Sequence, residues 1–330
     1  MNSSDVSAGA EQRAGQAAAK RGELRIVCGP TGAGKSALAL ALAERHALTI
    51  LVADSRQVYR GFNIGTAKPT AAERGRVPHE GVDLVDASER YSAAAWAAHA
   101  TAVIERLSAA RVLIVGGTGL YLRALVAPLF EEPPIDATRR AALAAELEAL
   151  DTATLRRWVM HLDASRAGLG RTQLLRALEV ALLTGRRISD LHRDAARVPR
   201  WTARWLVVDP LDQLHERIEH RLDAMLAGGW LDEVRELARA VPADAPAWNA
   251  CGYQALRQLT EFGARSREAA QDGNLDETRH AILVSTRQYA KRQRTWFRHQ
   301  LKGEAVTHID PRSADADARA DRWWQGGSAL

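Results

Sequence analysis

Short apolar runs alternate with helical patterns in the first third of the chain. Apolar runs occupy residues 24–28, 48–53 and 112–115, and apolar positions recur with helical spacing over 35–46 and 93–107. Apolar runs of this length suit buried strands, and strands that alternate with helices form parallel sheets with crossover helices. The pattern therefore predicts an α/β fold with a parallel sheet.

The pattern changes after Phe130. The segment Glu131-Glu132-Pro133-Pro134 interrupts it, and residues 137–191 then show helical spacing without strands. Strand character returns at 205–208, and residues 211–300 are again helical in pattern. Because the strands stop and later resume, we expect a helical insertion within the α/β fold.

These changes divide the chain into four predicted parts. A core comprises residues 22–125 and 201–310, and it encloses a helical insertion at 126–200. Residues 1–21 are small, polar and rich in alanine, which predicts a disordered lead-in. The last twenty residues, 311–330, are rich in Asp, Ala and Arg and predict a tail.

Composition is that of an ordinary globular protein. The chain has 330 residues, 46% of them hydrophobic, and a net charge of +5, which is only a weak sign of a nucleic-acid partner. Cys28 and Cys251 stand far apart, which argues against a disulfide framework or a structural zinc site. There is no signal-peptide pattern and no run of 18 apolar residues, so we expect a cytoplasmic protein without a membrane span.

The strongest motif is a phosphate-binding loop at residues 29–36. It fits GxxxxGK[S/T] in full and lies between a predicted strand and a predicted helix, which makes a chance match a minor alternative. Glycines allow the backbone to wrap round phosphate oxygens, and the helix N-terminus adds positive potential. Lys35 is expected to reach the terminal phosphate, and the Ser36 hydroxyl to bind a phosphate oxygen or its Mg²⁺. The predicted phosphate contacts are Gly29, Thr31, Gly32, Ala33, Gly34, Lys35 and Ser36.

This loop does not by itself identify the phosphate. Nucleotide triphosphatases normally pair it with a strand that ends in Asp and positions Mg²⁺. Here the strand at 112–115 ends in Gly116-Gly117-Thr118, and the nearest match to an acid-terminated strand is 206–209, after the insertion. The pattern therefore lowers the expectation of ATP or GTP hydrolysis. A small-molecule or nucleotide kinase stays open as an alternative, and it would need another acid for the metal.

Six further segments resemble one family, the tRNA dimethylallyltransferases (tRNA isopentenyltransferases), over roughly residues 23–300. They are Asp54-Ser55-Arg56-Gln57-Val58-Tyr59-Arg60-Gly61, Gly65-Thr66-Ala67-Lys68-Pro69, Val115-Gly116-Gly117-Thr118-Gly119-Leu120-Tyr121, Arg176-Ala177-Leu178-Glu179, Arg217-Ile218-Glu219-His220-Arg221 and the run from Thr286 to Trp296. The resemblance implies a P-loop kinase-like parallel sheet with a helical insertion domain and C-terminal helices.

The resemblance also implies a reaction. A dimethylallyl group would pass from dimethylallyl diphosphate to N6 of adenosine-37, next to the anticodon, in tRNAs that read codons beginning with U. The phosphate loop would then hold the diphosphate leaving group with Mg²⁺, which agrees with the acid-free strand. The implied partners are a tRNA anticodon stem-loop and the donor, with no membrane and no stable protein partner.

Three residues match positions to which the family assigns catalysis. Asp54 matches the general base, a role typically worth about 10²–10⁴ in rate, although an aspartate at a strand end can also cap a helix or bind Mg²⁺. Arg221 matches an arginine assigned to the diphosphate, and Arg217 lies one helical turn away. For both arginines a solvated helix face is the alternative. Thr118 matches a threonine near the reacting amine.

Contacts to tRNA are predicted at three places. An adenine in an unpaired loop is extruded easily, and polar and aromatic side chains after the second strand suit an extruded base. The helical pattern over 275–297 places Arg287, Lys291, Arg294 and Arg298 on one face, as phosphate contacts or as a solvated basic face. The predicted contacts are Asp54, Ser55, Arg56, Gln57, Tyr59, Thr118, Arg140, Arg171, Gln173, Arg176, Arg287, Lys291 and Arg294.

The chain departs from the family in the insertion. There the segment 168–172 replaces a more polar stretch, which puts individual tRNA contacts in doubt. The chain also has no cysteines for the zinc finger that many eukaryotic relatives carry, so it resembles the bacterial form. Two further alternatives remain, an adenylate isopentenyltransferase that acts on free nucleotides and a non-catalytic RNA-binding protein. The long insertion argues against the first of these, and the placement of Asp54 against the second.

Overall fold

The protein is described here from a computed structural model. It covers residues 22–127, 135–194, 201–265, 271–303 and 305–326, so the predicted lead-in at 1–21 lies outside the described residues. The chain divides into two compact units, and each is described by itself. The first combines Met1–Ala127 with Pro199–Leu330, and the second is Pro128–Val198.

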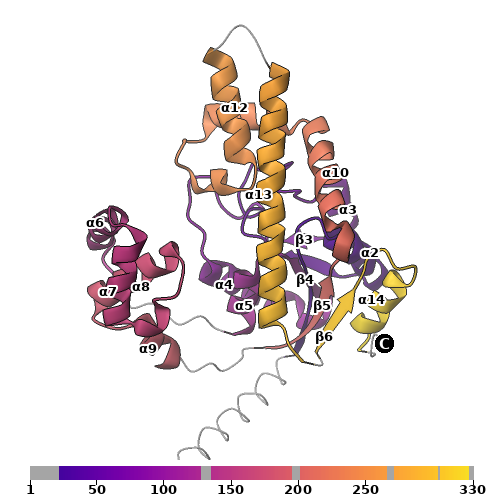
Figure 1. Ribbon diagram of the computed structural model, residues 1–330. Helices are drawn as coiled ribbons and strands as arrows, with labels where there is room; N and C mark the ends of the chain where they lie inside the picture. Colours follow the sequence, from indigo (N-terminus) through magenta and orange to yellow (C-terminus); the bar gives the residue numbers. More distant parts are fainter. Residues whose placement is uncertain (1–21, 128–134, 195–200, 266–270, 304, 327–330) are drawn as a thin grey trace, which may run out of the picture. The chain divides into compact units, whose positions relative to one another are not determined.

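A parallel six-stranded sheet forms the centre of the first unit and confirms the predicted fold class (Figure 1). The strand order is β3-β2-β4-β1-β5-β6. The strands are β1 (Glu23–Cys28), β2 (Thr49–Val52), β3 (His79–Glu80), β4 (Val112–Gly116), β5 (Thr202–Val208) and β6 (Val306–Ile309). The two edge strands, β3 and β6, are short and not fully buried, so their sequences carry no continuous apolar run that would predict them.

Helices connect the strands and extend beyond them. Those of the first unit are α2 (Lys35–His46), α3 (Ala71–Arg76), α4 (Ala93–Leu107), α5 (Gly119–Val126), α10 (Leu214–Ala227), α11 (Trp230–Ala240), α12 (Tyr253–Arg265), α13 (Gln271–Gln300) and α14 (Ala316–Trp324). Short 3₁₀ turns lie at Ala109–Arg111, Leu211–Gln213 and Pro246–Asn249. The bounds of α2 and α4 are those that the apolar spacing predicts.

Parallel register brings the strand ends together at one edge of the sheet. Cys28 at the end of β1 is paired with Gly116 of β4, and Val52 at the end of β2 with Val115. The loops that follow these three strands therefore start side by side at the carboxyl edge, which is where open α/β sheets bind ligands.

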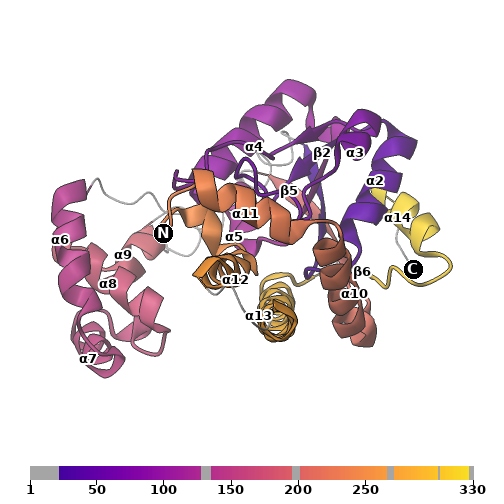
Figure 2. The ribbon, with the colours of Figure 1, turned by 90° about the horizontal axis from the view of Figure 1, so that it is seen from above.

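Helix α13 runs as one 30-residue helix from the edge of the sheet to α12 (Figure 1). The view along it shows α12 on one side and α10 on the other, and both helices contact it (Figure 2). Two helices, α10 and α13, and the loops after β1, β2 and β4 thus line one cavity at the carboxyl edge, although they are far apart in sequence.

The closing segment is not the tail that its composition predicts. Strand β6 pairs with β5, and α14 packs against α2. Trp323 is buried, the ring of Trp324 lies 4.6 Å from the Arg25 guanidinium, and Asp321 is 2.8 Å from His46 Nε2. Two adjacent tryptophans bury enough apolar area to dock a short polar helix, which overrides the charged composition around them.

The second unit has a hydrophobic core of its own. Its helices are α6 (Ala137–Glu148), α7 (Thr152–Leu162), α8 (Arg171–Thr184) and α9 (Ile188–Asp194), with a 3₁₀ turn at Ala164–Arg166. Leu155, Val159, Leu174 and Leu178 form the centre of the core and are fully buried. Within 135–194 the structure is helical without strands, as the sequence predicts.

A bilayer span would need a long apolar helix. Over the described ranges, no helix combines the required length and apolar character.

Candidate active site

The phosphate loop lies between β1 and α2 and depends on its glycines. Gly29, Gly32 and Gly34 have φ values of 145°, 78° and 95°, which disfavour a residue with a Cβ. A Cβ at Gly29 would also overlap the Val208 carbonyl oxygen of β5. Helix α2 begins without a side-chain cap, so its first amides remain for a ligand. Lys35 Nζ donates to the Pro30 carbonyl, 2.7 Å away, across the loop.

Gln293 of α13 joins the phosphate loop to the loop after β4. Its Oε1 accepts from the Thr31 amide at 2.8 Å, and its Nε2 donates to the Gly117 carbonyl at 2.9 Å. The side chain is only 7% exposed, and a Cβ at Gly117 would overlap it. The sequence did not single this residue out, although Gln293, Tyr289 and Trp296 share one helical spacing. That shared face is the signal that could have identified it.

Gln293→Glu should lower kcat/KM for the donor by about ten-fold to a hundred-fold. The carboxylate keeps the acceptor for Thr31 but loses the donor to Gly117 and adds negative charge beside a phosphate loop, and an unsatisfied buried polar group costs about 1–3 kcal/mol. Steady-state kinetics with varied donor would measure the loss. Gln288→Glu makes the same change at an exposed position of the same helix and should be near neutral. Equal behaviour of the two variants would remove Gln293 from the site.

Asp54 follows β2 and is held by its own backbone. Its Oδ1 accepts from the Arg56 amide at 2.8 Å and from the Gln57 amide at 3.4 Å. The carboxylate therefore closes a tight turn and does not cap a helix, since the next helix, α3, begins at Ala71. No other hydrogen bond reaches this carboxylate from the described residues, so Oδ2 can still accept a proton.

Thr118, Ser55 and Tyr289 form a small polar group beside Asp54. Thr118 Oγ1 accepts from the Ser55 amide at 3.1 Å. Burial and, after it, the negative charge of Asp54 raise the pKa of Tyr289 to about 12, against the opposing effect of a hydrogen bond to Thr118. Tyr289 therefore stays protonated at neutral pH. The structure brings predicted Thr118 close to predicted Asp54.

Two cations of α10 and the loop lysine give the phosphate loop a positive potential. Arg217 Nε donates to the Gly32 carbonyl at 3.0 Å, and an Nη of Arg221 donates to Thr31 Oγ1 at 3.3 Å. Burial and the nearby Arg221 charge lower the pKa of Lys35 to about 8, against the opposing effect of Asp54. Lys35 and Arg221 are both partly buried and form no ion pair with an acid of the described residues, so together they make a site prepared for an anion.

Donor binding should weaken as the pH rises above about 8. Below that pH Lys35 of the free protein is charged, whereas above it a bound diphosphate must first take up a proton, so the dissociation constant should rise up to about tenfold per pH unit. Titration calorimetry with dimethylallyl diphosphate on both sides of this pH would show it. Lys35→Arg keeps its charge and should lack this weakening. A wild-type affinity that is constant across the range would contradict the assignment.

A cavity of about 180 Å³ connects the phosphate loop with Asp54. Thr31, Lys35, Ser36 and Arg221 line one part, and Asp54, Arg56, Gly117 and Tyr289 line another. The remaining wall is mainly apolar and includes Ile218, Leu222, Met225, Trp230 and Ile282. One cavity thus combines an anion site, a carboxylate and an apolar surface.

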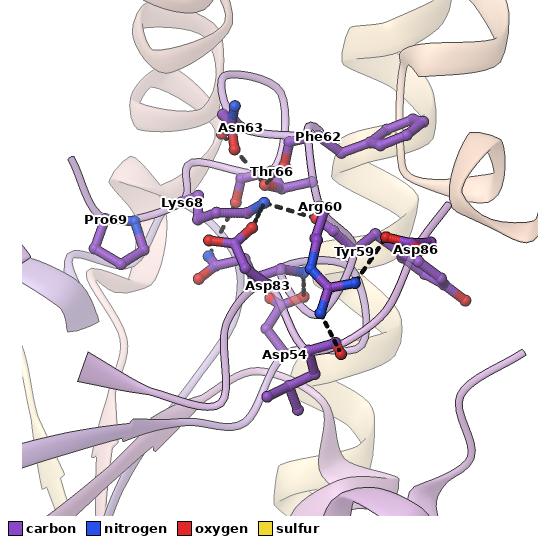
Figure 3. Close-up of polar contacts among 12 residues, drawn as sticks. Asp54, Tyr59, Arg60, Phe62, Asn63, Thr66, Lys68, Pro69, Asp83 and Asp86 are labelled. Atoms are coloured by element: carbon purple, nitrogen blue, oxygen red, sulfur yellow. Dashed lines mark hydrogen bonds and ion pairs between the residues drawn. The ribbon is translucent and has the colours of Figure 1, made fainter. Parts of the chain in front are cut away.

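The loop between β2 and α3 is held by an ion pair between the buried Lys68 and the partly exposed Asp83, which follows β3 (Figure 3). Lys68, whose side chain is 1% exposed, donates to the Tyr59 carbonyl and to Asp83 Oδ1, both at 2.6 Å. The Gln57 amide group donates to the carbonyl oxygens of Thr66 and Ala67 at 3.0 and 3.2 Å. These motif residues therefore hold the backbone of the cavity wall in place through hydrogen bonds inside the protein.

This arrangement changes the expectation for two predicted base contacts. Tyr59 is 4% exposed, so its ring is packed within the protein and is not open to stacking on a base. Gln57 lines the cavity, but its amide donors are already used. Arg56, which was predicted beside them, lines the cavity and stays a predicted contact.

The predicted basic face of α13 is partly neutralised inside the protein. Arg287 pairs with Glu219 of α10 at 3.1 Å, and Arg294 makes a bidentate contact with Asp209 after β5. Lys291 is exposed. Arg287 and Arg294, two of the predicted phosphate contacts, thus attach α13 to its neighbours through ion pairs with acids from distant segments. Lys291 stays a predicted tRNA contact.

The predicted contacts in the insertion also have partners within their own unit. Arg140 and Arg176 both pair with Glu179. Arg171 donates to the carbonyl oxygens of Leu150 and Glu148 near the end of α6, and Gln173 accepts from the Gly170 amide. Apart from these bonds, nothing in this unit tests their role toward tRNA, so they stay predictions.

A protein-built metal cage is not found in the described ranges, where no three His, Cys, Asp or Glu side chains are grouped suitably. Asp209, which ends the acid-terminated segment, is occupied by Arg294 and by the Leu211 amide. The exposed Ser36 hydroxyl at the start of α2 fits a Mg²⁺ that takes its other ligands from a diphosphate and water.

A phosphate loop that opens onto a cavity with a carboxylate and an apolar wall defines the chain as a phosphate-loop α/β protein equipped for group transfer. A family model described as IPP transferase matches residues 57–300, and one described as isopentenyl transferase matches residues 22–79. The chain belongs to the IPP transferase family.

Relatives with assigned names match most of the chain. The tRNA dimethylallyltransferase of Anaeromyxobacter sp. (strain K) is 42% identical over 91% of this chain and 96% of that relative. That of Geobacter metallireducens is 41% identical over 83% of this chain and 89% of that relative. The crystal structure of the full-length tRNA isopentenylpyrophosphate transferase from Bacillus halodurans has a TM-score of 0.63 and 29% identity, and the match covers 92% of this chain and 96% of that one.

Proposed function

We propose that this protein transfers a dimethylallyl group from dimethylallyl diphosphate to N6 of adenosine-37 in tRNAs that read codons beginning with U, releasing diphosphate. The names of its relatives support tRNA prenylation. The observation that carries the proposal is the shared cavity, in which the phosphate loop, Asp54 and an apolar wall meet. Its place of action would be the cytoplasm, without a stable protein partner.

Asp54 is the proposed general base. An adenine amine is a weak nucleophile because its lone pair is delocalised into the ring. As the N6–carbon bond forms, an N6 proton passes to the Asp54 carboxylate, whose Oδ1 is kept in place by two amides. In the proposed complex the Thr118 and Tyr289 hydroxyls, which lie near Asp54, orient the target adenine.

The phosphate loop receives the leaving group. As the allylic carbon–oxygen bond breaks, its electron pair stays on the diphosphate oxygen, and Lys35, Arg221 and the free amides of α2 stabilise the added charge. Ser36 would hold a Mg²⁺ that supplies further charge neutralisation when bound. No acid at the end of β4 is then needed, because the diphosphate and water supply the other ligands of that Mg²⁺.

One assay separates the proposal from its competitors. The protein is incubated with labelled dimethylallyl diphosphate, with and without a chelator, and with either total tRNA or AMP. Label should enter tRNA alone and should require Mg²⁺. Transfer to AMP would identify an adenylate isopentenyltransferase, and ATP turnover without transfer would identify a kinase. Either outcome would overturn the proposal.

A further inference from the structure

Helix α10 presents an ordered series of side chains to the cavity. Arg221 faces the phosphate loop, and Ile218, Leu222 and Met225 form a row at steps of four and three residues on the same wall. The row begins at the loop itself, where Ile218 Cγ1 lies 2.9 Å from the position of a Cβ on Gly32. It ends at Trp230, the first residue of α11. An apolar track therefore leads from the anion site to one indole ring.

Trp230 is held in a fixed position by backbone on two loops. A Cβ on Gly65 or on Gly252 would overlap the indole, so the backbone at both glycines lies directly against the ring. The Tyr253 ring packs edge-on against the indole, with the two ring centroids 5.3 Å apart. The Tyr253 hydroxyl accepts a hydrogen bond from the Gly65 amide at 3.0 Å and donates one to Glu233 at 2.6 Å. Trp230 is 2% exposed yet lines the cavity. The ring is a rigid wall and not a movable side chain.

The indole nitrogen adds nothing to this wall. Trp230 Nε1 is buried and has no hydrogen-bond partner among the residues that the structure describes. A tryptophan normally satisfies this group when it is buried. Trp230 therefore contributes to the cavity wall through the size of its ring and not through its N–H group.

The chemistry of the proposed transfer sets the direction of the donor chain. The diphosphate lies in the phosphate loop and the attacking nitrogen beside Asp54, so the reacting carbon lies between them. The hydrocarbon part of the donor beyond the reacting carbon must point away from the line that joins the diphosphate to the attacking nitrogen. The apolar side chains of α10 offer a surface on which it can lie. Resting on the proposed function, we propose that Trp230 ends this track and limits the donor to a single isoprene unit.

The test compares two donors in wild-type protein and in two variants. Removing the indole, or replacing it by a smaller apolar side chain, opens the end of the track. In Trp230→Ala and in the milder Trp230→Leu, kcat/KM for geranyl diphosphate relative to dimethylallyl diphosphate should rise by about 10–200-fold, the usual discrimination of an apolar pocket against extra methylenes. Transfer to tRNA is measured with both donors in competition.

Trp248→Ala is the matched control, since Trp248 is equally buried and packs on Tyr253 but does not line the cavity. It should lower thermal stability without changing the donor ratio. An unchanged ratio in Trp230→Leu, or a wild-type protein that uses both donors equally, overturns the inference while the proposed function stands. If wild-type protein transfers neither chain to tRNA, the proposed function itself has failed.

Discussion

Asp54→Asn should lower the transfer rate by a factor of about 10²–10⁴, while the variant still binds tRNA and donor. The asparagine side-chain oxygen can accept from the Arg56 and Gln57 amides as the aspartate does, so the turn after β2 should persist. What disappears is the basic oxygen that takes the N6 proton. Single-turnover assays with saturating donor and tRNA would measure the chemical step directly.

The control for this variant is Asp86→Asn. Asp86 lies in the segment between β3 and α4, is exposed, and pairs at 2.7 Å with Arg60 of the loop that follows Asp54, outside the cavity lining. An exposed ion pair is worth little, so its transfer rate should stay within a factor of two or so of wild type. Binding of both substrates by Asp54→Asn, measured separately, shows that the site is intact. A near wild-type rate would leave Asp54 with its turn-forming role alone.

The core of the fold could be predicted because its signals are local. Strand β4 is buried along its whole length, and the helical spacing of α2 and α4 gives their bounds. The docking of α14 could not be predicted in this way. It depends on Trp324 meeting Arg25, nearly three hundred residues earlier, and a polar composition conceals that contact.

The candidate site also has one part that could be predicted from local sequence and another that depends on distant contacts. The phosphate loop carries its own signature, since glycines and Lys35 stand at fixed spacing. Whether a charged residue is available depends on partners that spacing cannot show. Arg294 has the right place on its helix, but Asp209 meets it from β5. Gln293 likewise gains its role only when α13 crosses the two loops.

The loop between β2 and α3 shows a third case. Its motif residues resemble a substrate-binding segment, yet Lys68 is used to bind Asp83 and the Tyr59 carbonyl inside the protein. A motif shared with a family thus identifies the site without saying which side chains touch the substrate. Burial and hydrogen bonding have to supply that distinction.

Arg221→Gln should lower the transfer rate by about 10²–10³, as the loss of one charge-stabilising donor does at other sites of developing negative charge. Arg221 lines the cavity beside the phosphate loop and is close enough to Lys35 to lower the pKa of that amine. Removing it takes away the guanidinium that meets the departing diphosphate. Rapid-quench measurement of the first turnover would separate this loss from weaker donor binding.

The same variant makes a second, independent prediction about pH. Without Arg221, the charge that helps burial to lower the pKa of Lys35 is gone, so Lys35 should stay protonated to a higher pH and the weakening of donor binding should begin above about 8. Arg279→Gln removes an equal charge that bridges α13 to Asp223 on α10 outside the cavity, and it should leave both the rate and the pH profile unchanged. A rate loss in Arg221→Gln with an unshifted pH profile would mean that Arg221 acts on the diphosphate without electrostatic coupling to Lys35. Equal losses in the two arginine variants would instead assign the effect to the total charge of α10 and α13, and Arg221 would have no place in the mechanism.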